Sequence, residues 1–226
     1  MFESRARDII VPQAEHAKLA GVVARLWGNS EFQKPNVDFE SFTLGVDLHD
    51  RCYGEMDNYP IGRLSDEVWV PLERDYGVEP ALDDPAATML IRLHIKRLAQ
   101  IRSTPERIAL AKEIDEKVNA AAKKYSLNRD DFERADRIMD FCDSLAFDFS
   151  FEMPTRRAIE VYADPNAATP VKLEYYIKAN GVIELEPWPL SVPEYSGNIV
   201  GYEAQGYPDN PVPTIMPFTL RPLSSK

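Results

Sequence analysis

Before residue 153, hydrophobic residues recur at spacings of three and four, which is the period of one face of an α-helix. This pattern predicts helices over residues 13–27, 39–53, 85–101, 104–127 and 129–151. Thr104 followed by Pro105, and Asn128, are typical of residues that begin a helix. Residues 54–84 are rich in proline, glycine, aspartate and tyrosine, and this composition predicts a long loop.

After Met153 the hydrophobic period becomes two, which is typical of a β-strand with one buried face. The pair Asn180-Gly181 favours a tight hairpin turn between two such segments. Strands are predicted at residues 157–163, 171–178, 182–186 and, more weakly, 199–205.

The remaining C-terminal stretches, residues 187–195 and 208–218, are rich in proline. Because proline cannot donate to a strand ladder, we expect these stretches to be edge or connecting segments. The whole pattern predicts a mainly α fold. Residues 1–152 would form a helical domain, and residues 153–226 a small antiparallel β-appendage packed on it.

Composition narrows the class of protein only broadly. A chain of 226 residues fits one domain, or one domain with a small appendage. The formal net charge of −11 disfavours a surface for a nucleic acid polymer, since phosphate contacts need lysine and arginine. We expect no membrane span and no secretory signal, because no apolar run is long enough. Two cysteines fit neither a disulfide framework nor a zinc ribbon, so a cytoplasmic location is expected.

Histidine occurs only three times, and each copy lies on a predicted helix. His16 opens the first, His49 is followed by Asp50 at the end of the second, and His94 lies within the third. Asp143 lies on the last helix. Imidazole nitrogens and carboxylate oxygens together suit Mn²⁺, Fe²⁺, Co²⁺, Ni²⁺ or Zn²⁺. We therefore expect a divalent metal ion, and no other cofactor.

The spacing of the second helix places His49 on the same face as Phe42 and Val46, which directs it toward the core. Successive helical residues point roughly 100° apart, so His49 and Asp50 both reach a cation only if it lies beside the helix between them. With His16 and Asp143, they would form a partial shell with positions open for water and substrate.

Four further residues are candidates for catalysis. Asp57 and Glu55 follow the His-Asp pair and could take a proton from an activated water. His94 could be an extra ligand, a donor to phosphate or a general acid, and Arg97 shares its helix face. Asp136, Asp140 and Asp143 form an acidic stripe that could equally be a solvated helix face.

The order of these residues resembles the HD-domain superfamily, whose all-helical members carry a histidine, a His-Asp pair and a late aspartate as metal ligands. His16 matches the first ligand, His49 and Asp50 the pair, and Asp143 the last. The resemblance covers the predicted helical domain and implies an HD-domain-like bundle. Most members are metal-dependent phosphohydrolases, often acting on nucleotides, and some relatives with more histidines are di-iron oxygenases.

The segments QAEHAKLAG, HDRCYGEMDNYP and MLIRLHIKRL are also similar to a bacterial family of unknown function with a β-rich tail. That family typically has the pattern HDxGWxxxDxxP. Here Cys52 and Tyr53 replace the glycine and the tryptophan, while Asp57 and Pro60 match.

The leading hypothesis is a metal-dependent phosphohydrolase that acts on a small phosphoester, such as a nucleotide. In this hypothesis His94 or Arg97 stabilises the developing charge. One alternative is a non-catalytic metal-binding or sensor protein, so the sequence leaves enzymatic activity open. An iron oxygenase is less favoured, because three histidines are few for a two-iron centre. Taken singly, each histidine could also be an ordinary core residue bonded to a backbone group.

Overall fold

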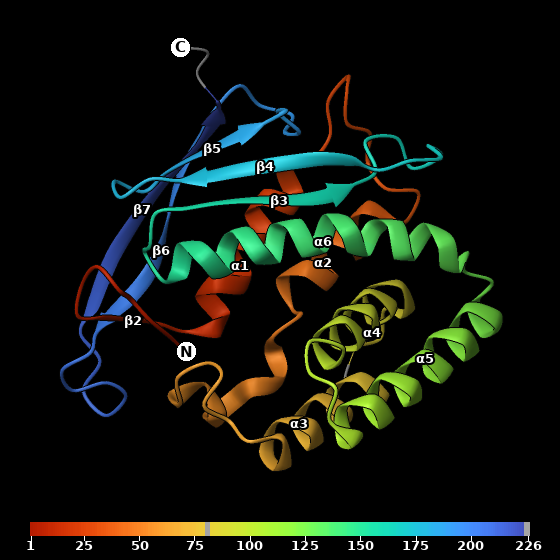
Figure 1. The fold of residues 1–226 in the computed structure, drawn as a ribbon, viewed down its shortest axis with the longest axis horizontal. Coiled ribbons are helices and arrows are strands. Elements are labelled where there is room, and N and C mark those ends of the chain that lie inside the picture. Colours follow the sequence, from red (N-terminus) through yellow and green to blue (C-terminus); the bar gives the residue numbers. More distant parts are fainter. Residues whose placement is uncertain (80–81, 224–226) are drawn as a thin grey trace.

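The computed structural model describes residues 1–79 and 82–223 of the chain. Helices account for 46% and strands for 20% of it, and a seven-stranded mixed sheet curls into a half-barrel beside the helices (Figure 1). The fold is therefore α/β. The predictions of a mainly α, or all-α, fold, of an HD-domain-like helical bundle and of a small antiparallel appendage are wrong, because the sheet is large and draws strands from both ends of the chain. Residues 224–226 of the predicted appendage lie outside the described part.

The helical segments lie between the first two strands and the remaining five. They are α1 (Gln13–Leu26), α2 (Phe39–Asp47), the 3₁₀ helix η1 (Arg51–Asn58), α3 (Asp66–Val78), α4 (Pro85–Ala99), α5 (Pro105–Tyr125) and α6 (Arg129–Ser150). The side chain of Thr104 caps α5 by accepting from the Arg107 N–H, and that of Asn128 caps α6 by accepting from the Asp130 N–H. Both predicted helix starts are therefore confirmed.

Two predictions between residues 39 and 84 need correction. The second helix ends at Asp47, so the His-Asp pair lies in the turn between α2 and η1 rather than on a helix. The predicted loop contains most of η1 and all of α3, and its positions 80–81 lie outside the described residues. The buried face of α3 includes Glu73 and Gly77, and Pro71 lies within the helix. These residues conceal the apolar period that identifies the other helices.

The sheet has the strand order β1-β2-β6-β7-β5-β4-β3. The strands are β1 (Phe2–Glu3), β2 (Ile9–Val11), β3 (Thr155–Val161), β4 (Val171–Ile177), β5 (Val182–Glu186), β6 (Tyr195–Glu203) and β7 (Pro213–Pro222). Neighbours are antiparallel except for β5 and β7, which are parallel. β2 precedes α1 but pairs with β6, so the sheet joins the beginning of the chain to its C-terminal part.

The proline-rich segment that includes residues 213–218 is not a connection but the start of a central strand. β7 pairs with β6 along Pro213–Leu220, and with β5 only from Thr219 onward. Thr219 donates its N–H to Gly181 on the β5 side. Because N–H groups alternate along a strand, the nitrogens of Pro213 and Pro217 face the same side as that of Thr219. They lie in the part of β7 that does not pair with β5. Proline therefore removes no ladder hydrogen bond here.

The long helix α6 lies between β3 and β4 on one side and α1, α2 and α4 on the other (Figure 1). Tyr175 of β4 fixes this position: its hydroxyl contacts the Ser144 carbonyl at 3.0 Å and the Asp148 carboxylate at 2.6 Å. The opposite face of α6 is thereby presented to α1 and α4. Within the described part of the chain, no helix combines the length and apolar character needed to cross a membrane.

Candidate metal centre

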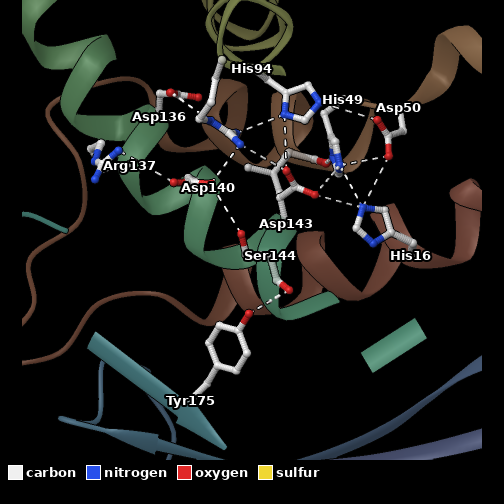
Figure 2. A network of polar contacts seen from close by, with 12 residues as sticks. His16, His49, Asp50, His94, Asp136, Arg137, Asp140, Asp143, Ser144 and Tyr175 are labelled. Carbon is white, nitrogen blue, oxygen red and sulfur yellow. Dashed lines mark hydrogen bonds and ion pairs between the residues drawn. The ribbon is translucent and has the colours of Figure 1, made fainter. Parts of the chain in front are cut away.

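All three histidines of the chain converge on one buried point, together with Asp50 and Asp143 (Figure 2). His16 comes from α1, the His49-Asp50 pair from the turn after α2, His94 from α4 and Asp143 from α6. The histidines are at most 1% exposed. Packing of four separate elements therefore places five polar side chains in the interior of the helical layer.

The innermost atoms of this cluster are closely spaced. Nε2 of His16 lies 3.2 Å from Nε2 of His49, 3.1 Å from Asp143 Oδ1 and 3.4 Å from Asp50 Oδ2. Nε2 of His49 lies 3.4 Å from the same Asp50 oxygen and 3.5 Å from the same Asp143 oxygen. Each of the two imidazole nitrogens thus lies within 3.5 Å of both carboxylate oxygens. His16, His49 and Asp143 form one group of potential metal ligands, and His49, Asp50 and His94 form a second that overlaps it.

The orientation of His49 is fixed from behind. Its Nδ1 lies 2.6 Å from the Val46 carbonyl, which can only accept a hydrogen bond, so Nδ1 carries the proton that is donated. In the neutral ring the lone pair then lies on Nε2, directed at the centre of the cluster. Histidines that bind metals usually donate their other ring N–H to a carbonyl or carboxylate in this way, which fixes the tautomer and the ring orientation.

In the neutral ring of His94, the proton lies on the other nitrogen than in His49. Arg97 Nη2 donates to His94 Nδ1 at 3.1 Å, so the proton of the neutral ring lies on Nε2. That nitrogen lies 3.6 Å from Asp50 Oδ1 and has no hydrogen-bond partner among the described residues. Burial and the positive charges of His49 and Arg97 lower the pKa of His94, which keeps the ring neutral. His94 therefore presents an N–H donor at the edge of the cluster rather than a lone pair.

Arg97 holds the acidic stripe of α6 in place. Its guanidinium lies 3.4 Å from Asp136, 2.9 Å from Asp140 and 3.4 Å from Asp143. The stripe is thus not a solvated face, since Asp136 and Asp143 are buried. Burial would lower the pKa of Arg97, but the three carboxylates raise it above its ordinary value. Arg97 binds Asp143 through Oδ2 and so leaves Oδ1 directed at the histidines.

The charges of the cluster compensate one another. Burial alone would lower the pKa of His49, but the carboxylates of Asp50 and Asp143 raise it well above its ordinary value. Burial would likewise raise the pKa of both carboxyl groups, and the neighbouring histidines lower it instead. Without a cation, the buried carboxylates therefore hold a proton on an imidazole. A bound cation takes the place of that proton, so metal binding releases protons.

Asp57 and Glu55 are not brought to this network. Asp57 accepts the backbone N–H of Gln13 at 2.8 Å and pairs with the Met1 amine at 2.6 Å. It thereby caps the start of α1, where Pro12 offers no side-chain acceptor. Glu55 is exposed. The predicted role of these two carboxylates as general bases has no contact in the structure to support it.

Glu73, on α3, was not among the residues predicted from the sequence. Its side chain is 1% exposed, and neither carboxyl oxygen has a hydrogen-bond partner among the described residues. Burial and the charge of Asp50 raise the pKa of Glu73 to about 8. No local signal marked this residue, because its helix reads as a loop from the sequence.

Comparison with known proteins places the chain in a family without a known reaction. The family described as "Protein of unknown function (DUF3891)" matches residues 2–202, and the chain belongs to it. The match spans the site-bearing helices and most of the sheet. It confirms the coarser part of the sequence-based resemblance, a family of unknown function. No curated protein and no solved structure matches the chain. The division at residue 152 stays a prediction.

Proposed function

We propose that this protein is a metal-dependent hydrolase that cleaves a phosphoester bond of a small molecule. The observation that supports this function is the convergence of His16, His49, Asp50 and Asp143 from separate elements on one buried point. The same four residues, in the same order, carry the resemblance to the HD-domain superfamily, whose members are mostly phosphohydrolases. All four lie in the helical layer of the molecule.

The donor set fits a divalent cation of the series Mn²⁺, Fe²⁺, Co²⁺, Ni²⁺ and Zn²⁺. His16 and His49 would supply neutral nitrogens, and Asp50 and Asp143 two negative charges that balance the charge of the ion. When bound, such a cation supplies Lewis acidity that activates water near neutral pH. Four protein ligands leave room for water and substrate on a cation that accepts six donors.

The other residues of the site act on charge and orientation. His94 is placed to donate its Nε2–H to a phosphoryl oxygen as negative charge develops there. Arg97 is a positioning residue, because three carboxylates already compensate its charge. In the net reaction, the oxygen of water forms a bond to phosphorus and the ester P–O bond breaks. The leaving oxygen takes a proton, which gives an alcohol and inorganic phosphate.

Metal content and turnover test this proposal together. The protein is stripped with a chelator, reloaded separately with Mn²⁺, Co²⁺, Ni²⁺, Zn²⁺ or, without oxygen, Fe²⁺, and analysed for bound metal. Each form is then assayed with p-nitrophenyl phosphate and a set of phosphomonoesters and nucleotides. We expect a single tightly bound cation and release of inorganic phosphate.

Three results would contradict the proposal. Bound metal without turnover on any phosphoester would favour a non-catalytic binding or sensor protein. Oxygen uptake by the iron form would favour the oxygenase. Absence of stoichiometric metal in every form would remove the basis of the proposal.

A further inference from the structure

A cavity of about 260 Å³ lies beside the metal-ligand cluster. It is lined by the start of α1, by η1 and the segment that follows it, by α3, by the ends of α4 and α6, and by the start of α5. Its wall includes Gln13, Tyr53, Ile61, Trp69, Leu98 and Phe147. None of these residues has a role in the cluster described above.

The cavity and the cluster share their supporting elements. Three wall residues lie one helical turn from a cluster residue: Gln13 from His16 on α1, Leu98 from His94 on α4, and Phe147 from Asp143 on α6. Side chains three or four residues apart on a helix lie on the same face. Tyr53 likewise follows Asp50 by three residues along the chain. The cavity therefore lies next to the cluster, along the same faces of these helices.

The wall is mainly apolar and aromatic, and its two arginine side chains contact a carboxylate. The guanidinium of Arg107 stacks on Trp69 at 3.7 Å from the ring centre, but it also binds Asp66 at 2.8 Å. Arg102, at the rim, lies 3.9 Å from the same carboxylate. One carboxylate serves both guanidinium groups, so the positive charge left over in the wall lies at Arg102, whose side chain is 52% exposed. An uncharged group fits these surroundings.

One polar atom of the wall needs a partner. Gln13 is 2% exposed, and its side-chain Oε1 has no hydrogen-bond partner among the described residues. A buried acceptor left in this state is unfavourable by the energy of its lost hydration. Gln13 lines the cavity, and a turn of its amide that brings Oε1 to the cavity surface would let a donor on a bound molecule satisfy it. Gln13 thus distinguishes ligands that carry an N–H or O–H from those that do not.

We propose that this cavity binds the leaving group of the substrate, and that this group is a single uncharged aromatic ring carrying a hydrogen-bond donor. Engineered cavities of about 150 Å³ hold benzene, so the space here accepts one ring with short substituents. Edge-to-face and stacked contacts with Tyr53 and Trp69 suit such a ring. The inference rests on the proposed hydrolase only for the bond that is broken; the binding itself does not depend on it.

Binding is tested first, with neutral probes and no turnover. Benzamide offers a ring with N–H donors, and methyl benzoate offers a similar ring without one. Ligand-observed NMR should show benzamide binding to the protein about tenfold more tightly than methyl benzoate. Gln13→Leu should abolish this preference; its backbone N–H, which bonds Asp57, is retained. Equal affinity for the two probes in the unsubstituted protein would overturn the assignment of Gln13.

Filling the cavity provides the second arm. Ile61→Trp should weaken binding of both probes at least tenfold, whereas Ile215→Trp, at a 60% exposed position on β7, should leave it unchanged. With metal-loaded protein, Ile61→Trp should raise KM for phenyl phosphate but not for methyl phosphate. Metal content and melting temperature verify that each variant is folded. If Ile61→Trp does not fold, the comparison of the two probes in Gln13→Leu still tests the proposal.

The two arms separate the two proposals. Benzamide binding that Ile61→Trp weakens, without turnover of any phosphoester, would support the cavity and contradict the hydrolase. Turnover of both phosphates, without benzamide binding or with binding that Ile61→Trp leaves unchanged, would support the hydrolase and overturn the cavity.

Discussion

The Nε2 atoms of His16 and His49 face each other at 3.2 Å in the interior of the protein. The proton of neutral His49 is committed to the Val46 carbonyl at the other side of its ring. A lone pair therefore points at His16, and two carboxylates lie within 3.5 Å of the same two nitrogens. Such a pair needs a shared proton or a shared cation between the rings. The donor set favours the cation.

His49→Ala or Asp50→Ala should reduce the bound cation severely, because each variant removes a ligand and the neighbouring His94 presents an N–H rather than a lone pair. Elemental analysis of the purified variants, reloaded under identical conditions, measures this. Glu55→Ala, at an exposed position, is the matched control and should keep its metal. Full metal content in both ligand variants would show that the cluster is not the binding site.

His94→Ala should retain the cation and lose about 10²–10³-fold in turnover, because it removes the N–H donor placed for the phosphoryl oxygen. His16→Gln should lose the cation and, with it, the thermal stabilisation that a bound ligand provides. Metal content and melting temperature of the two variants, measured side by side, decide between the roles. Equal metal loss in both would place His94 among the ligands.

Arg97→Met should destabilise the protein by about 3–5 kcal/mol. The variant leaves the carboxylates of Asp136, Asp140 and Asp143 without the guanidinium that contacts all three. Urea denaturation of the metal-free protein gives this free energy of unfolding. Arg137→Met is a close control: its side chain is 41% exposed, lies 3.8 Å from the Asp140 carboxylate and donates to the Glu160 carbonyl at 3.2 Å. We expect less than about 1 kcal/mol there. Similar losses in both variants would mean that Arg97 contributes no more than a surface ion pair.

Glu73 should make stability fall as pH rises. In the folded protein the pKa of its carboxyl is raised from an ordinary value of 4.5 to about 8. Between these two values the unfolded chain has lost the proton and the folded protein retains it, so unfolding becomes more favourable with increasing pH. Above the folded value the penalty is complete, at most about 5 kcal/mol.

Glu73→Gln keeps the shape of the side chain and removes its titration, so this variant should be more stable than the parent at pH 9. Its stability should fall less between pH 5 and pH 9, and the fall that remains is expected from His49, whose pKa is also raised. Urea denaturation of the metal-free proteins at pH 5 and pH 9 measures both quantities. Glu67→Gln, exposed on the same helix, should change stability by less than about 0.5 kcal/mol. An unchanged slope in Glu73→Gln would show that Glu73 is not the group responsible.

Local sequence patterns were sufficient to predict most helices and to identify the residues of the cluster. The apolar period and the caps at Thr104 and Asn128 located α5 and α6. The scarcity of histidine singled out the side chains that the structure brings together. The contact between Arg97 and His94 follows from their spacing of three residues, and the structure contains it. Each of these features depends on residues close together in sequence.

The sheet could not be found in this way. β1 and β2 have only two and three residues, too few to show a period, and β2 pairs with β6 from the other end of the chain. The prolines of β7 argue against a strand until the position of β5 is known. Glu73 and Gln13 escaped attention because only tertiary packing buries them and leaves their oxygens without partners.

The most direct test of the metal centre is an anomalous-difference map from a crystal of the protein loaded with Co²⁺. We predict one peak bonded to Nε2 of His16, Nε2 of His49 and the carboxylates of Asp50 and Asp143, at about 2.0–2.2 Å. Nε2 of His94 should remain beyond bonding distance. A map with no peak at this point, and with the His16 and His49 nitrogens still 3.2 Å apart, would contradict the account.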